Sequence, residues 1–191
     1  MCYNSHVSEE SKVFKVICER CSVRSYSDRP IEENKLMLIL EAARLAPSAS
    51  NSQPWHFYVV KDKEKIKALS HKMPLGSQVV VNTFLAQAPV VIVATAGPLG
   101  LLHRMASFIV NKKWYYIDVG IALEHMVLTA WELGIGSCWI GWFDEKKVKR
   151  LLNISAGEEV ISMVTLGYPE EGYVPRPKER KGLNEIVKIL D

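Results

Sequence analysis

The chain has 191 residues, of which 48% are apolar and 24% are charged. This composition is typical of a globular protein and excludes a disordered or collagen-like chain. The net charge is only +3, which is too small for a polyanion-binding surface, so nucleic acid is not an expected partner. We expect residues 1–10 to be disordered and residues 11–191 to form a single domain.

Three further observations concern the cellular compartment. No apolar run reaches the roughly 18 residues that a membrane span requires, so no membrane association is expected. The first twelve residues carry neither the basic nor the apolar region of a signal peptide. The four cysteines are too few for a disulfide scaffold in a chain of this size. Together these features predict a cytoplasmic protein.

Periodicity gives the expected elements. Residues 30–46 repeat apolar positions at helical spacing, begin at a proline that suits a first helical turn, and end before Pro47. Residues 89–96 are apolar without alternation, which predicts a strand buried on both faces. Residues 115–133 are apolar on every side, so this helix belongs in a core or at a subunit interface. In chain order we expect a helix over 11–20, a helix over 30–46, a strand over 55–61, a helix over 63–71, a strand over 89–96, a helix over 115–133, a strand over 135–143, a helix over 145–152, a strand over 160–167, and a short helix or added strand over 183–190.

Strands scattered among helices predict an α/β or α+β class with a central sheet. No Gly-x-Gly-x-x-Gly follows the first strand, and no Gly-x4-Gly-Lys-Ser/Thr occurs anywhere. A dinucleotide-binding Rossmann domain and a P-loop both need those glycines for close approach to phosphate, so both are excluded.

A short segment near the N-terminus has the chemistry of a phosphate receptor. Arg20, Ser22 and Arg24 alternate along the chain, so in an extended segment their side chains point the same way. Two guanidiniums and a hydroxyl on one face would bind phosphate well. The alternative is a solvated basic connector, which is a common surface feature.

The loop over residues 47–55 is polar but carries no charge, with three serines, an asparagine and a glutamine between two prolines. Its neutral donors and acceptors suit the edge of an uncharged heterocycle, and the alternative is a turn rich in Asx and Ser motifs. Residues 134–143 place three glycines among aromatic residues. Glycine inside a strand indicates a bulge or a close approach to the backbone, although a strand packed under the long helix also fits.

Five blocks of the sequence together resemble the nitroreductase family of FMN-binding flavoproteins, in one colinear order over about residues 15–190. The first is Arg20-Cys-Ser-Val-Arg24, and the second is Pro47-Ser-Ala-Ser-Asn-Ser-Gln-Pro-Trp55, similar to the family's Pro-Ser-x-x-Asn-x-Gln-Pro-Trp. Residues 118–122 and 134–143 resemble its central helix and glycine-rich strand. The last block is Lys178-Glu-Arg180 with Leu183-Asn-Glu-Ile-Val187.

The resemblance implies an α+β fold, an α/β/α sandwich whose central mixed, mainly antiparallel sheet is flanked by helices. It also implies an intertwined homodimer with FMN at the subunit interface. Arg20, Ser22 and Arg180 would hold the FMN phosphate, with Lys178 or Lys181 nearby, and Cys21 is part of the same phosphate-binding segment. Arg24 would reach the pyrimidine edge of the flavin. The loop of the second subunit that would line the ring contributes Pro47, Ser48, Asn51 and Gln53, and the backbone of Ile140, Gly141 and Trp142 would lie near flavin N5.

The implied activity is transfer of hydride from NADPH or NADH, through flavin N5, to nitroaromatics, quinones or related small acceptors in alternating steps. No catalytic side chain and no metal is expected, because the flavin carries the chemistry. Residues 97–112 are a candidate substrate lid. The alternatives are an FMN carrier or sensor without turnover, and a specialised flavin enzyme such as a dehalogenase or a consumer of reduced flavin.

Overall fold

The structure is a computed structural model that describes residues 11–70, 72–75, 78–97 and 113–190, with backbone alone for 72–75 and 78–81. The expectation of a disordered N-terminus over 1–10 lies outside the described residues. So does the candidate lid over 97–112, apart from Gly97.

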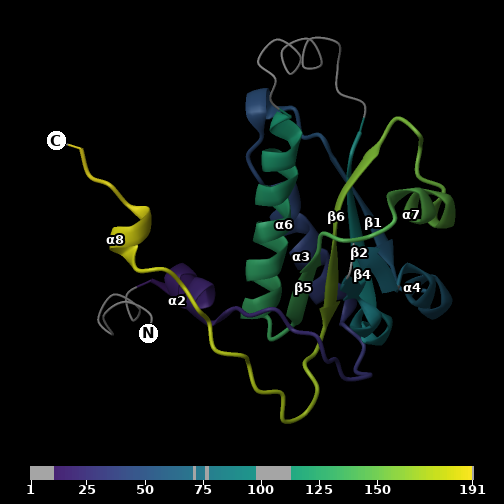
Figure 1. Ribbon diagram of the computed structural model, residues 1–191, viewed down its shortest axis with the longest axis horizontal. Coiled ribbons are helices and arrows are strands. Elements are labelled where there is room, and N and C mark those ends of the chain that lie inside the picture. Colours follow the sequence, from purple (N-terminus) through teal and green to yellow (C-terminus); the bar gives the residue numbers. More distant parts are fainter. Residues whose placement is uncertain (1–10, 71, 76–77, 98–112, 191) are drawn as a thin grey trace.

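A four-stranded sheet forms the centre of the molecule (Figure 1). Its strands lie in the order β1 (Trp55–Val60), β4 (Val90–Ala96), β6 (Glu159–Gly167) and β5 (Gly136–Ile140). The sheet was expected to be mixed and mainly antiparallel, and all three of these strand pairs are antiparallel. Parallel pairing occurs, within the described residues, as an isolated bridge between Ser22 and Ser137 at the free edge of β5.

Helices cover both faces of the sheet, as the sandwich prediction requires. On one face lie α3 (Glu33–Arg44) and α6 (Trp114–Glu132), and on the other lie α4 (Lys63–Leu69), α7 (Glu145–Leu152) and the 3-10 helix η2 (Thr83–Gln87) (Figure 1). The central strand β4 is buried along its whole length. Its alternate residues enter the two cores: Val90, Ile92, Ala94 and Ala96 face α3 and α6, while Val91 and Val93 face α4 and α7.

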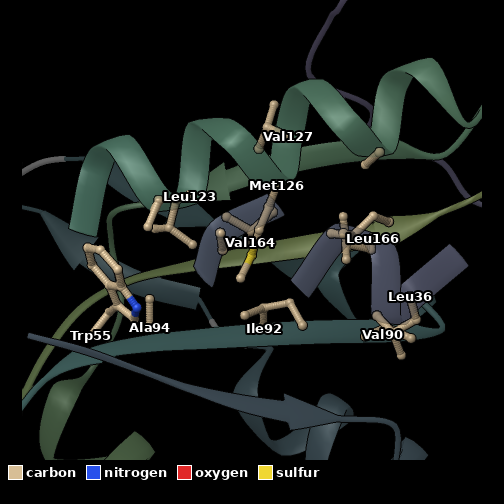
Figure 2. Close-up of a cluster of buried hydrophobic side chains, with 14 of the residues drawn as sticks. Leu36, Trp55, Val90, Ile92, Ala94, Leu123, Met126, Val127, Val164 and Leu166 are labelled. Atoms are coloured by element: carbon tan, nitrogen blue, oxygen red, sulfur yellow. The ribbon is translucent and has the colours of Figure 1, made fainter. Parts of the chain in front are cut away.

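The core under α6 explains why that helix is apolar on so many sides. Figure 2 shows Leu123, Met126 and Val127 of α6 above Ile92 of β4 and Val164 of β6. All five side chains are fully buried. Burial of each stabilises the fold by about 1.5–3 kcal/mol relative to exposure. Further apolar side chains of α6, such as Ile117, remain exposed.

Several predicted boundaries were wrong. The helix expected over 30–46 begins at Glu33, because Glu32 has an extended backbone and its carboxylate accepts hydrogen bonds from Arg29 and Tyr168. The strand expected over 135–143 ends at Ile140, where the chain turns away from β6. The helix expected over 63–71 ends at Leu69, with Ser70 as its C-cap. The hairpin of β2 (Lys72–Leu75) and β3 (Gln78–Val81) was not predicted.

The two ends of the described chain lie together, outside the sandwich. The N-terminal helix α2 (Lys12–Glu19) is capped by Ser11 and has no buried residue. Beyond β6 the chain runs past α2 to the short helix α8 (Leu183–Ile186), which stands apart from the sheet (Figure 1). Apolar side chains of this tail are exposed to solvent in the single chain, among them Leu183, Ile186 and Leu190.

Candidate flavin-phosphate site

The connector after α2 runs along the free edge of β5 in the extended conformation that the sequence predicted. Cys21 and Val23 are buried, whereas Arg20, Ser22 and Arg24 face outward. The alternation is therefore as expected. The Val23 N–H donates to the Ser137 carbonyl oxygen of β5 at 2.8 Å.

Gly136 permits this approach. A β-carbon at Gly136 would lie 2.6 Å from Val23 Cγ2 and 2.8 Å from Val23 Cβ. Either distance is a steric clash, so only glycine allows the connector to lie against the strand. The glycine pattern predicted a close approach to the backbone, and at Gly136 the group that approaches is Val23 of the same chain.

A buried tyrosine holds the end of the connector. The Tyr26 hydroxyl donates to the Val23 carbonyl oxygen at 2.6 Å and lies 2.6 Å from the Thr165 hydroxyl of β6. Thr165 in turn donates to the Cys138 carbonyl oxygen at 3.3 Å. Burial raises the pKa of Tyr26 far above its ordinary value, so the hydroxyl stays protonated. This network fixes the connector to two strands of the sheet.

The connector and the C-terminal segment enclose a basic pocket of about 170 Å³. Two hydrogen bonds join the segments: the Tyr173 hydroxyl donates to the Ser22 carbonyl oxygen at 3.2 Å, and the Lys178 ammonium donates to the Cys18 carbonyl oxygen. The pocket is lined by Arg20, Cys21, Ser22, Arg24, Arg176, Pro177, Lys178, Glu179 and Arg180.

The pocket therefore brings together six of the predicted residues from two distant segments of the chain. Arg20, Cys21, Ser22 and Arg24 come from the connector, and Lys178 and Arg180 lie more than 150 positions later. Lys181 is exposed and does not line it. Arg176 lines it but was missed by the sequence reasoning. The only available signal was its position two residues before the Lys-x-Arg motif.

The electrostatics of the pocket favour an anion. Five side chains of its lining are cationic and one, Glu179, is anionic. Arg20 also lies near Glu124 of α6, whose pKa is raised by burial and lowered in part by Arg20. Beneath the pocket, burial raises the pKa of the Cys138 thiol, and Arg24 partly opposes that rise. The thiol is therefore protonated at neutral pH.

The predicted ring-binding loop lies elsewhere in the single chain, between α3 and β1. It contains the 3-10 helix η1 (Ala49–Asn51). Positive φ angles occur at Ser50 (51°), Asn51 (54°) and Gln53 (44°). Left-handed backbone at residues other than glycine costs free energy and is concentrated at functional sites.

Local hydrogen bonds hold this strained loop in place. The Gln53 side-chain amide donates to Asn51 Oδ1 at 3.1 Å, and the Gln53 N–H donates to Ser48 Oγ at 2.9 Å. The buried carboxylate of Asp118 on α6 accepts from the Ala49 N–H at 3.0 Å. Asn51 and Gln53 are nevertheless exposed, so polar groups on a rigid loop face outward.

The third predicted group follows the end of β5. The Ile140 side chain is buried, whereas Gly141 and Trp142 are exposed. The Trp142 carbonyl oxygen accepts from the Asn82 amide at 2.7 Å, which fixes the chain just after the strand. A β-carbon at Gly141 would meet nothing within 4 Å. Packing among the described residues therefore does not explain the glycine.

Neither the loop over 47–53 nor residues 140–142 line the basic pocket. In the described part of one chain, the three predicted groups thus do not share one pocket.

The remaining cysteine and histidine side chains of the described residues form neither a disulfide nor a metal-binding cluster. Within the described residues, no group of three or more His, Cys, Asp or Glu side chains is arranged to hold a metal ion. Cys18 and Cys21 are not joined by a disulfide. His125 is half-buried on α6, where its Nδ1 lies 3.1 Å from the Ala42 carbonyl oxygen. None of the helices in the described part of the chain has the length and apolar character needed to cross a membrane.

Comparison with known proteins shows the family to which the chain belongs. A model of the nitroreductase family matches residues 17–168. The chain belongs to the nitroreductase family. The family predicted from the five sequence blocks is therefore confirmed, and so is its fold class.

Three relatives of this nitroreductase-family chain are informative. An Archaeoglobus fulgidus protein, provisionally named NADH dehydrogenase/NAD(P)H nitroreductase, is 38% identical over 161 residues, covering 82% of this chain and 85% of its own. A Bacillus subtilis protein named FMN reductase (NAD(P)H) is 29% identical, over 88% of this chain and 70% of its own. The solved structure of an FMN-dependent nitroreductase from Clostridium difficile has a TM-score of 0.73 and 28% identity, over 93% of this chain and 99% of its own.

Proposed function

We propose that this protein is an FMN-dependent oxidoreductase that passes electrons from NAD(P)H to a small-molecule acceptor, with the FMN phosphate in the basic pocket. The expectation of an NAD(P)H-dependent flavin enzyme with FMN as its cofactor is confirmed by the family and by the names of the relatives. The single observation that carries the site is the convergence of Arg20, Ser22 and Arg180 in one pocket.

The donor set fits the phosphate end of FMN. Guanidiniums, an ammonium and a hydroxyl are the groups that bind a phosphate dianion most strongly. The volume of about 170 Å³ is smaller than the roughly 300 Å³ at which pockets for whole ligands begin. The flavin ring must therefore lie outside this pocket, against other surfaces.

A second copy of the chain would supply those surfaces. Several apolar side chains of α2, α3 and α6 are at least half exposed in the single chain, which is typical of an interface; they are Val13, Met37, Leu38, Leu45 and Ile117. A groove of about 320 Å³ lies between the same three helices. We therefore propose a homodimer in which the exposed loop over 47–53 reaches the flavin ring of the other subunit.

In this arrangement the side chains of the protein bind and orient the cofactor. When bound, FMN supplies the electron-transfer chemistry itself. Arg20 and Ser22 fix the phosphate, Arg24 places a cation at the pyrimidine edge, and that cation favours a negatively charged ring. The backbone at Gly141 leaves open space for close approach of the ring. We also propose a cytoplasmic location.

Nitroaromatics, quinones or related compounds are the proposed acceptors, reduced in a half-reaction that alternates with oxidation of NAD(P)H. Anaerobic titration of the purified protein with NADPH, and separately with NADH, tests this directly. We expect flavin absorbance at about 370 and 450 nm, a property of the cofactor, to bleach with at least one nicotinamide. An acceptor should then restore it, and steady-state double-reciprocal plots should be parallel. Bound flavin that neither nicotinamide bleaches would indicate a carrier and contradict the proposal.

A further inference from the structure

Arg176 lies in the basic pocket although no recognised motif contains it. We propose that Arg176 is a further phosphate-binding residue, which pairs with Arg20 to make the pocket select phosphorylated flavin over the unphosphorylated form. This inference rests on the proposed function, because it assumes that the pocket holds the FMN phosphate.

The backbone around Arg176 is fixed from both sides. The two tethers between the segments join Tyr173 to Ser22 and Lys178 to Cys18, so the C-terminal segment runs antiparallel to the connector. Arg176 falls between these tethers in the sequence, as Arg20 does on the connector, and both residues line the same pocket.

Arg176 is also flanked by prolines on both sides, at 175 and 177. Proline restricts its own φ and disfavours helical backbone at the residue before it, so Arg176 is held extended. Little backbone entropy is therefore lost when its side chain binds an anion.

Among the described side chains, no carboxylate forms an ion pair with Arg176. Within the described part of the chain, its guanidinium makes no hydrogen bond and no ion pair. Four other cations line the pocket with it, and the acid in the lining is Glu179. Like charges held together repel one another, and an anion that accepts hydrogen bonds from several of them relieves that repulsion.

The alternative is that Arg176 is simply an exposed, solvated arginine. The two interpretations differ in what they predict for riboflavin, which shares the ring and ribityl chain of FMN but lacks the phosphate. A phosphate ligand affects FMN binding alone. A residue that supports the fold or attracts the ring affects both molecules equally.

The test measures dissociation constants of FMN and riboflavin for the wild-type apoprotein and for Arg176→Ala, Arg176→Lys, Arg20→Ala and Arg150→Ala. Arg150 is an exposed arginine in the last turn of α7, outside the pocket. The Arg150→Ala variant therefore removes the same charge away from the pocket. We expect Arg176→Ala to weaken FMN binding about tenfold or more and to leave riboflavin binding unchanged. Arg176→Lys should keep part of the preference, Arg20→Ala should lose it, and Arg150→Ala should keep all of it.

The outcomes separate the inference from the proposed function. If Arg20→Ala loses the preference for FMN and Arg176→Ala keeps it, Arg176 is not a phosphate ligand and the proposed site stands. An equal loss of both affinities in Arg176→Ala also overturns the inference. If the wild-type protein binds FMN no more tightly than riboflavin, the proposed phosphate pocket itself is wrong.

Discussion

At the scale of single residues, two glycines of the same segment have opposite reasons to be glycine. Gly136 is confined by the chain, because Val23 occupies the space where its side chain would be. Gly141 is unconfined, because none of the described residues has an atom within 4 Å of that space. One glycine thus serves the fold, and the other is available for a ligand.

Alanine at each glycine separates these roles. Gly136→Ala should destabilise the apoprotein by about 1–3 kcal/mol, the usual cost of overpacking, and displace the connector that carries Arg20. Gly141→Ala should leave the stability of the apoprotein unchanged and weaken FMN binding. Thermal denaturation without FMN, followed by FMN titration, measures both effects. A destabilised Gly141→Ala apoprotein, or one with undiminished FMN affinity, would contradict the role assigned to Gly141.

The candidate site was largely predictable from the sequence where the chemistry lies in local spacing. The alternation of Arg20, Ser22 and Arg24 needed only an extended backbone. Arg176 was not predictable, because its place opposite Arg20 depends on the tertiary contacts of Tyr173 and Lys178. The glycine pattern predicted a close approach in this strand, but not that Val23 is the neighbour of Gly136, because Val23 is 113 positions away in the sequence.

At the scale of elements, periodicity predicted the long helices and the central strands, and tertiary contacts decided their ends. The start of α3 is the clearest case. The Glu32 carboxylate accepts hydrogen bonds from Tyr168 and Arg29 and forms a longer ion pair with Lys35. This cluster holds Glu32 in the extended conformation that precedes the helix. The hairpin of β2 and β3 was missed because residues 72–81 were given no prediction. The short strand β5 ends where its pairing with β6 ends.

The cluster at Glu32 makes stability depend on pH in the acid range. The hydrogen bond from Tyr168, the Glu32 backbone N–H and Arg29 lower the pKa of Glu32 to about 2. A lowered pKa in the folded state means that the stabilisation is fully present above about pH 4.5 and is lost as the pH falls toward 2. We expect Glu32→Gln to show a smaller decrease in melting temperature between pH 5 and pH 3 than the wild type.

The matched control is Glu33→Gln, one residue further along. Glu33 is exposed and pairs with Lys61 alone among the described side chains, so its removal takes away only a surface ion pair. Its acid-induced decrease in melting temperature should follow that of the wild type. Equal behaviour of the Glu32 and Glu33 variants would show that the cluster does not stabilise α3.

At the scale of the whole molecule, the polar loop over 47–53 and the end of β5 do not line the basic pocket of the single chain. Apolar side chains are exposed on α2, α3 and α6 and along the C-terminal tail. A dimer would bury these side chains and bring the loop of one subunit toward the pocket of the other. The sequence predicted that arrangement only through its resemblance to the family.

The most direct test of the account is a crystal structure of the protein with FMN bound. We expect the phosphate between Arg20, Ser22 and Arg180 of one subunit, the pyrimidine edge beside Arg24, and the ring in contact with the loop over residues 47–53 of the partner subunit. A phosphate bound outside the basic pocket would contradict the account, and so would a flavin ring enclosed by one chain alone.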